Sequence, residues 1–432
     1  MKTLLAAMAL ASLSIPAAAA PSRADRAAQS HVASDVAHGE ALLERLVMQN
    51  SGTMNRDGVR AAGAIVAPLL TELGFETRWV DGAAWQRAGH LVATHRGNGR
   101  GKRILLIGHL DTVFEPDAAF TGYRVEGRRA VGPGVGDDKG GVVIIVQALR
   151  AMRAAGTLRD ADIMVVLTGD EERVGSPISA ARRDLIAAGE WADVAIEYEN
   201  LATDQGQEFG TVARRGSTSW QLSVTARSGH SSGVFGSGGY GAIYEAARIL
   251  DRFRQELPEP NLSVNVGLLV GGTPASIDLE TETASATGKT NIIPAAAQAR
   301  GDLRTLTPEQ EAAARAKMQA IVASAPLNGA EATLTFSEAY PPMAPTAGNR
   351  ALLTRLNAVN RDLGLPQMAE YDPARRGAAD SSFVAALADT IGGMGPAGGG
   401  AHAPGEWVNL DSLPRQALRS AVLIARLSAE RR

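Results

Sequence analysis

The sequence predicts an α/β protein in which a mixed, mostly parallel sheet flanked by helices is interrupted by a smaller α+β domain. Through roughly the first 200 residues, apolar runs with strand character alternate with segments of helical periodicity, an order typical of parallel sheets. From residue 214 to 338 the strand patterns instead alternate polar and apolar residues, as antiparallel strands exposed on one face do. The chain has 432 residues, more than a single core usually serves, which also indicates two domains.

The first 20 residues predict a secretory signal peptide. One lysine precedes an apolar run from Leu4 to Ile15, and Ala18-Ala19-Ala20 comes directly before Pro21. The run is shorter than the ~20 apolar residues that a membrane helix needs. We therefore expect the mature protein to be exported, to the periplasm or the medium, without a membrane anchor.

The composition restricts the chemistry further. The chain has no cysteine, so disulfides and thiolate metal sites are excluded, and any metal ligand must be His, Asp or Glu. The formal net charge is −3, which gives no reason to expect nucleic acid or an acidic membrane surface as a partner.

Residues 21–213 are expected to form the first part of the main domain. Helical patterns cover residues 23–48, 59–73, 142–155 and 179–188, and Gly74 is the expected C-cap of the second. Strand patterns cover 75–80, 91–95, 103–108, 162–167 and 194–196.

Residues 214–338 are expected to form the inserted α+β domain, with a four-stranded antiparallel sheet. The strand patterns are residues 219–226, 263–270, 298–303 and 332–336, and a helix covers 241–254. A second helix begins after Thr307, where Pro308 takes the first position and Gln310 completes a capping box. Residues 339–432 then return to the main domain, with helices at 352–363 and 413–427.

The stretch from Val131 to Gly141 places two adjacent carboxylates, Asp137 and Asp138, in a glycine-rich loop between apolar runs. Buried side by side, these carboxylates would repel each other, and a metal ion would remove the conflict. The alternative is an ordinary glycine-rich turn whose acids are solvated.

Other polar residues follow the ends of predicted strands. His109 and Asp111 follow one strand, Glu171 and Glu172 a second, and Glu199 a third. Ligands bind off the carboxyl ends of the strands in open α/β sheets, so these groups are expected to converge at one edge.

Three of the seven histidines lie in glycine-containing loops at the ends of elements: His109, His230 and His402. Any one of them alone is more simply structural, but three beside the carboxylates favour a metal site. The others are expected to be solvent-facing (His31 and His38) or structural (His90 and His95). Residues 392–400, before His402, are expected to form a flexible loop.

Together these motifs resemble the co-catalytic zinc carboxypeptidases and amidohydrolases of the glutamate carboxypeptidase (carboxypeptidase G), succinyl-diaminopimelate desuccinylase and aminoacylase family, nearest the glutamate carboxypeptidase branch. The matching stretches, in family order, are residues 108–113, 132–141, 168–172, Glu199, residues 228–231, residues 291–294 and His402.

The resemblance implies two Zn²⁺ ions per subunit, bridged by Asp137, although Co²⁺ or Mn²⁺ are alternatives. His109 and Glu199 would complete one site, and Glu172 and His402 the other. Asp111 would orient the His109 ring, and Glu171 would be the general base. The resemblance also implies a cis peptide bond between Asp137 and Asp138.

For the inserted domain the resemblance implies a lid that also forms a homodimer. His230 would stabilise the oxyanion, reaching across from the partner subunit as in dimeric relatives. Asn291 and Arg304 would hold a substrate carboxylate; the alternative for Arg304 is an ordinary surface arginine at a strand end.

The sequence departs from the nearest branch where substrate is expected. Asn200 replaces the usual proline after Glu199, the loop at residues 231–240 is long and glycine-rich, and a late loop reads Gly377-Ala378-Ala379-Asp380. The expected function is an exported dizinc hydrolase that cleaves an amide next to a free carboxylate in a small peptide or N-acyl amino acid, with glutamate preference left open. There are two alternatives: an aminoacylase or dipeptidase of the same family, and a non-catalytic relative that binds metal or peptide.

Overall fold

The computed structural model describes residues 21–432 except 280, 338 and 339, so the expected signal peptide lies outside the described residues. The main domain is built on a six-stranded sheet of order β1-β2-β6-β3-β7-β19. Strands β6, β3, β7 and β19 run parallel, whereas β2 is antiparallel to both β1 and β6, which confirms a mixed, mostly parallel sheet. The strands are β1 (Glu76–Asp81), β2 (Gly89–His95), β3 (Ile104–His109), β6 (Ile163–Thr168), β7 (Val194–Glu197) and β19 (Asp389–Ile391).

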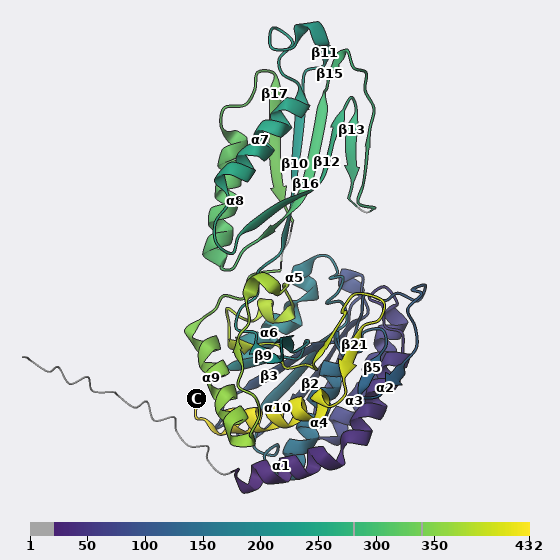
Figure 1. Cartoon of the computed structure of the whole chain (residues 1–432), viewed down its shortest axis with the longest axis vertical. Helices are drawn as coiled ribbons and strands as arrows, with labels where there is room; N and C mark the ends of the chain where they lie inside the picture. The colour runs from purple at the N-terminus through teal and green to yellow at the C-terminus, as the bar shows by residue number, and fades with distance from the viewer. Residues whose placement is uncertain (1–20, 280, 338–339) are drawn as a thin grey trace, which may run out of the picture.

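Helices cover both faces of this sheet (Figure 1). In β3, Ile104 and Leu106 face one apolar cluster while Leu105 and Ile107 face the other, as strand alternation requires. The larger cluster is formed with α1 (Arg23–Ser34), α2 (Val36–Met48), α3 (Arg56–Glu72), α4 (Lys139–Ala155), α9 (Ala347–Leu363) and α10 (Ser412–Ala429), and the smaller with α5 (Ile178–Ala181) and α6 (Arg183–Trp191).

Two predicted helices are each divided in the structure. The pattern at residues 23–48 becomes α1 and α2, separated by Asp35, whose buried carboxylate pairs with Arg150 of α4 at 3.0 Å. The pattern at 179–188 becomes α5 and α6, separated by Arg182, whose fully buried side chain turns inward to Asp170 and Asp380 at 2.6 and 2.7 Å. In both places a buried ion pair accompanies the break in the helix.

The glycine-rich run at 392–400, expected to be flexible, is held by backbone hydrogen bonds. Leu201 N donates to Pro396 O at 3.0 Å, and Gly395 N donates to Glu199 O at 2.9 Å. Part of the run forms a strand of a small sheet that the sequence did not predict: β20 (Gly398–Gly399), β21 (Trp407–Asn409), β5 (Arg129–Val131) and β4 (Arg124–Glu126). Isolated backbone bridges also connect the run to the segments that flank a second unpredicted sheet, formed by β18 (Ala369–Glu370), β9 (Gln207–Gly210) and β8 (Ala202–Asp204).

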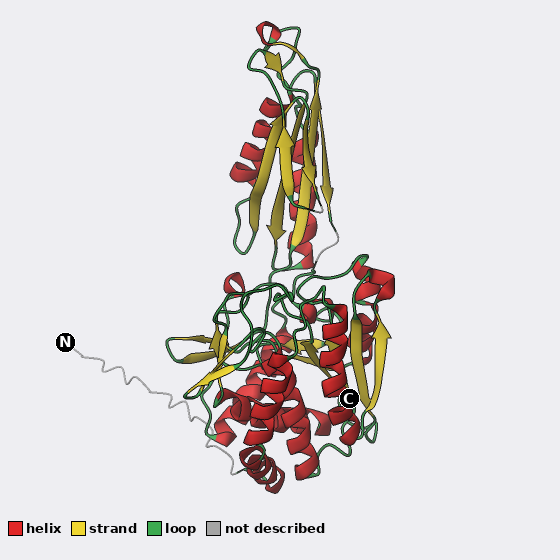
Figure 2. Ribbon diagram, turned by 90° about the vertical axis from the view of Figure 1, so that its right-hand side faces the viewer, coloured by secondary structure: helices red, strands yellow, loops and turns green. Residues whose placement is uncertain are grey.

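The inserted domain is a separate body at one end of the main domain (Figures 1 and 2). Its four-stranded antiparallel sheet has the order β12-β16-β10-β17, and α7 (Ala242–Glu256) and α8 (Pro308–Ala323) cover one face. The strand–helix–strand–strand–helix–strand order is ferredoxin-like. The strands are β10 (Thr218–Ala226), β12 (Ser263–Gly272), β16 (Ala296–Arg304) and β17 (Ala330–Phe336). Two short antiparallel pairs accompany them, β11 (Gly229–His230) with β15 (Ile292–Ile293) and β13 (Ala275–Asp278) with β14 (Thr283–Ala286).

The cap of α8 differs in one detail from its prediction. Thr307 Oγ1 accepts from Gln310 N at 3.1 Å, as expected, but Gln310 Oε1 accepts from Leu306 N at 2.8 Å instead of from Thr307 N. The cap therefore satisfies a donor one residue earlier than a capping box would.

The two chain segments that connect the domains lie side by side. Ser217 and Tyr340 exchange backbone hydrogen bonds of 2.9 and 3.1 Å, and Arg214 and Met343 exchange two of 3.0 Å. The predicted boundary at 338 falls just before this pairing, on a residue that is not described. Among the helices that are described, none is long and apolar enough to cross a membrane.

Candidate metal centre

The carboxyl ends of three parallel strands bring the predicted polar residues to one edge of the sheet. His109 ends β3, Glu171 and Glu172 follow β6, and Glu199 follows β7. Ligand atoms of His109, Glu171 and Glu199 lie within 4.8 Å of one another, and so do those of His109, Asp137 and Glu172. The convergence expected at the sheet edge is therefore present.

Asp137 lies between two imidazoles. Its Oδ1 is 2.9 Å from His109 Nε2, and its Oδ2 is 3.1 Å from His402 Nε2. His402 Nε2 is also 3.1 Å from Glu172 Oε2. The other oxygen of Glu172, Oε1, is buried and has no hydrogen-bond partner among the described residues.

The charges in this cluster shift one another's pKa values. Burial opposes the shift, but contacts with Asp111 and Asp137 raise the pKa of His109 well above its usual value. Contacts with Asp137 and Glu172 raise the pKa of His402 to about 10. Despite burial, the two imidazoles hold the pKa of Asp137 well below its usual range. The two imidazoles thus lie where positive charge favours the ionised form of a buried carboxylate.

Asp111 contacts the His109 ring and also fixes the backbone of two other residues of the cluster. His109 Nδ1 is 3.1 Å from the Asp111 carbonyl oxygen and 3.5 Å from its carboxylate. The same carboxylate accepts from the backbone N–H groups of Glu171 and Glu172 at 3.0 and 3.1 Å, and from Thr53 Oγ1 at 2.6 Å. One buried carboxylate therefore positions residues that follow two neighbouring strands.

The loop that carries Asp137 is fixed by Glu406, which the sequence did not single out. Glu406 Oε1 accepts from Gly136 N and Asp137 N at 2.8 and 2.9 Å, and Oε2 accepts from Gly134 N at 2.8 Å. Gly134 has φ +68, a left-handed conformation that favours glycine. Burial raises the pKa of Glu406 to about 7. The only sequence signal was that Glu406 lies four residues after His402.

The bond between Asp137 and Asp138 is cis, as predicted. Asp138 Oδ2 accepts from His109 N at 3.2 Å, so its side chain supports a neighbouring residue of the cluster.

Glu199 is paired with a second unpredicted residue, Arg214, from the segment that leads into the inserted domain. Arg214 Nη2 is 2.8 Å from Glu199 Oε2 and also contacts Glu197. Burial raises the pKa of Glu199 to about 7, and Arg214 opposes that shift.

The predicted oxyanion-stabilising residue His230 and the predicted substrate-binding residue Asn291 lie away from this centre. They belong to β11 and to the turn before β15, at the end of the inserted domain farthest from the main domain (Figure 1). His230 is exposed, and its Nδ1 is 2.8 Å from Ser232 Oγ. Within one chain these residues therefore do not join the metal cluster.

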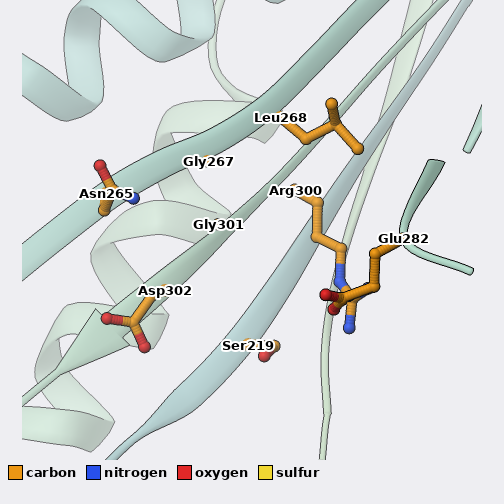
Figure 3. A pocket seen from close by; sticks show the side chains of 8 residues that line it. All are labelled: Ser219, Asn265, Gly267, Leu268, Glu282, Arg300, Gly301 and Asp302. Carbon is orange, nitrogen blue, oxygen red and sulfur yellow. Dashed lines mark hydrogen bonds and ion pairs between the residues drawn. The ribbon is translucent and has the colours of Figure 1, made fainter. Parts of the chain in front are cut away.

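Arg304 is at the opposite end of β16, which spans nine residues, or roughly 27 Å at ~3.4 Å per residue. Within one chain, Asn291 and Arg304 therefore cannot hold the same carboxylate. Arg304 Nε is 2.8 Å from Asp302, which lines a hollow of about 310 Å³ on the open face of the sheet. The other charged residues of that hollow, Arg300 and Glu282, are also paired, at 3.1 Å (Figure 3).

The residues of the cluster fit a metal. Two imidazoles and several carboxylates are ligands that borderline Zn²⁺ accepts. Their mutual distances of 2.9–3.1 Å are close to those between ligands of one ion, and Glu172 has a buried oxygen without a partner.

Comparison with known proteins agrees with this geometry. The family model of peptidase family M20/M25/M40 matches residues 105–425. Carboxypeptidase G2 from Pseudomonas sp. (strain RS-16) is 28% identical over 393 residues, which are 90% of this chain and 88% of that protein. A succinyl-diaminopimelate desuccinylase from Leptothrix cholodnii is 31% identical over 200 residues, 44% of this chain and 51% of that protein.

Solved structures share the fold. A tripeptidase from Staphylococcus aureus superposes with a TM-score of 0.70 at 19% identity, covering 91% of this chain and 99% of that one. A dinuclear metal-binding peptidase of family M20 from Bacillus subtilis gives a TM-score of 0.64 at 15% identity, covering 92% and 99%. Since the matched residues run from β3 to α10 and include all five predicted metal ligands, the chain belongs to peptidase family M20/M25/M40 and is a metallopeptidase or amidohydrolase of that family.

Proposed function

We propose that this protein is an exported dizinc hydrolase that cleaves an amide or peptide bond next to a free carboxylate, as a carboxypeptidase does. The observation that carries the proposal is the Asp137 carboxylate, which presents one oxygen to His109 and the other to His402. A carboxylate in that position can serve two cations at once.

In this proposal Asp137 bridges the two ions, His109 and Glu199 complete one site, and Glu172 and His402 complete the other. The relative from Bacillus subtilis is described as dinuclear, which supports two ions, and the donor set suits zinc. When bound, the ions would lower the pKa of water and polarise the substrate carbonyl.

Glu171 is the proposed general base. Its backbone is fixed by Asp111, and its carboxylate lies in the same group as His109 and Glu199. Burial and the nearby Glu199 raise its pKa well above the usual value, which suits a group that must take up a proton. The Glu171 carboxylate accepts a proton from the attacking water as the C–O bond forms. It then passes that proton to the amine nitrogen as the C–N bond breaks.

We also propose that the active form is a homodimer in which His230 and Asn291 serve the partner's centre. Their place at the far end of the inserted domain leaves them without a role in their own chain. Exposed apolar side chains on α7 and β12 offer a surface for the second copy: Ile243, Tyr244, Val266 and Leu269. The unpaired edge of β12 lies in the same sheet.

The activity is tested by measuring zinc content and hydrolysis of a panel of N-acyl amino acids and dipeptides. Hydrolysis of carboxylate-bearing substrates with about two zinc ions per chain supports the proposal. Preference for N-acyl amino acids or for dipeptides would favour the aminoacylase or the dipeptidase alternative. Metal binding without hydrolysis would favour a binding protein. Export is tested by N-terminal sequencing of the mature protein after expression from the full chain.

The dimer is tested by co-expressing His230→Ala with Glu171→Gln. Each homodimer lacks one essential group at both centres. A mixed dimer has one complete centre if His230 acts on the partner, so random assortment should restore about a quarter of wild-type activity. No restoration would show that His230 acts within its own chain or not at all.

A further inference from the structure

We propose that Arg376 binds a carboxylate of the substrate, beside the metal centre and on the main domain. This inference rests on the proposed function and names a residue that determines its substrate class. Its evidence is the pairing of three arginines around the cluster, of which Arg182 and Arg214 are buried and Arg376 is mostly buried.

Two of these arginines are each paired with two carboxylates. Arg182 contacts Asp170 and Asp380 at 2.6 and 2.7 Å, and it also donates to Tyr340 Oη at 2.9 Å. Arg214 contacts Glu197 and Glu199. Both cations are thereby neutralised by carboxylates of the protein itself.

Arg376 is different. Its Nη2 donates to the carbonyl oxygen of Asn200 at 2.8 Å and is 3.9 Å from Glu199 Oε2. Its Nε is buried without a partner, as is that of Arg214. Unlike the other two arginines, Arg376 has no carboxylate within hydrogen-bond distance in the part of the chain that the structure describes. The side chain is only 14% exposed. A mostly buried guanidinium without a carboxylate partner and with an unpaired Nε is costly unless an anion completes it.

The position of Arg376 is fixed, so the group is preorganised for a ligand. Arg214 Nη1 donates to Gly377 O at 2.9 Å, and Asp372 caps the preceding 3-10 turn by accepting from Ala374 N at 2.9 Å. The contact with Asn200 places the guanidinium one residue from Glu199, a proposed metal ligand. A substrate whose scissile amide lies at the metal centre can therefore place its neighbouring carboxylate, or a carboxylate on the adjacent side chain, against the Arg376 guanidinium.

The same contact joins two places where the sequence departs from the nearest branch of its family. Asn200 stands where a proline is usual, and Arg376 immediately precedes the divergent loop that begins at Gly377. Asn200 Oδ1 is also buried without a partner, and a side chain at Gly136 would be 2.7 Å from it. Two differences that looked independent in the sequence therefore form one structural feature.

The test compares Arg376→Met with Arg376→Lys and with a matched control, Arg375→Met. Arg375 is the neighbouring residue, and it pairs at the surface with Asp204 at 2.8 Å. The substrates are an N-acyl glutamate, the corresponding N-acyl glutamine, and the N-acyl glutamate α-amide. Calorimetric Kd values for glutamate and glutamine with the zinc-loaded protein give a readout that does not depend on turnover.

Losing a charge-assisted contact should raise the KM of Arg376→Met roughly 10- to 100-fold, with the zinc content unchanged. Arg376→Lys should fall between this variant and wild type, and Arg375→Met should stay within about twofold of wild type. The increase in KM should disappear with the analogue that lacks the carboxylate that Arg376 binds. Its disappearance with the α-amide indicates the α-carboxylate, and its disappearance with N-acyl glutamine indicates the side-chain carboxylate.

Failure of this proposal is distinguishable from failure of the proposed function. If wild type hydrolyses no substrate but binds glutamate more tightly than Arg376→Met does, the proposed function fails and the role of Arg376 stands. If wild type is active and the variant has unchanged KM and Kd values for every ligand, Arg376 only supports Asn200 and this proposal is wrong. A wild-type protein that binds neither amino acid, or a KM penalty found in Arg304→Ala and absent from Arg376→Met, also overturns it.

Discussion

Replacing Glu406 with glutamine should weaken metal binding although Glu406 is not among the proposed ligands. Its carboxylate accepts three backbone N–H groups of the loop that carries Asp137, at 2.8, 2.8 and 2.9 Å. An amide offers only one oxygen. In the better of its two orientations, the oxygen faces Gly136 and Asp137 while the NH₂ group opposes Gly134 N–H.

The expected cost follows from that geometry. One buried N–H loses its acceptor, which costs ~1 to 3 kcal/mol, and the two remaining bonds lose the assistance of the charge. If this free energy is lost from the hold on Asp137, zinc should bind roughly 10- to 100-fold more weakly, which is the usual effect of losing a group that orients a ligand.

The assay is competition for zinc against a chelator of known affinity, with circular dichroism to confirm folding. Glu126→Gln is the control, because Glu126 lies on β4 of the nearby small sheet and, among the described residues, pairs only with exposed Arg124. Activity of Glu406→Gln should recover in excess zinc. Zinc affinity equal to that of wild type would refute the idea that Glu406 holds the bridging carboxylate in place.

Three further predictions concern single contacts. Glu171→Gln should keep both metals and lose at least roughly a hundredfold in kcat, because the base is removed while the ligands remain; metal loss, or activity within about tenfold of wild type, would contradict the role. Tyr340→Phe removes the hydroxyl that donates to Glu171 O at 2.9 Å, so kcat should fall by up to about tenfold with zinc content unchanged, and an unchanged kcat would show that the contact does not position the base. The pKa of Asp184 is lowered: burial would raise it, but Arg78, 2.8 Å away, and Arg183 hold it below its usual value. Asp184→Asn should therefore lower the free energy of unfolding by less than about 1 kcal/mol at pH 7, and this difference should vanish as the pH falls through the lowered pKa. A difference that persists in acid would show that the effect is not electrostatic.

Much of the metal cluster could be predicted because its residues follow strands whose apolar patterns are strong. A fully buried strand such as β3 or β6 is easy to recognise, and parallel strands must bring the residues after them to one edge. The strand β19 was missed because it has only three residues and is followed by glycines, so its pattern resembles a loop. The glycine-rich run after it was called flexible in the prediction for the same reason, yet its backbone is paired.

Residues that act through distant contacts could not be predicted in this way. Three residues that the sequence did not indicate belong to residue types common on protein surfaces, and each lies in a segment without clear periodicity: Glu406, Arg214 and Arg376. Their roles depend on partners from 15 to 272 residues away in sequence, such as Gly134 for Glu406 and Glu199 for Arg214. Periodicity reports which face of an element is buried, and it contains no information about which loop a buried charge will meet.

The connection between the domains links the two parts of the proposed mechanism. The segment entering the inserted domain carries Arg214, which contacts Glu199, and the segment leaving it carries Tyr340, which donates to the carbonyl of Glu171. These two segments are hydrogen-bonded to each other through Ser217 and Tyr340. If the inserted domain rotates, the backbone must change conformation either on the domain side of this pairing, near the start of β10, or in the paired residues themselves. If the rotation is absorbed beyond the pairing, Glu171 and Glu199 keep their positions while His230 moves toward the centre that it serves in the proposed dimer. If it is absorbed within the pairing, closure would also move Glu171 and Glu199, so that the centre would be complete only when the inserted domain has closed.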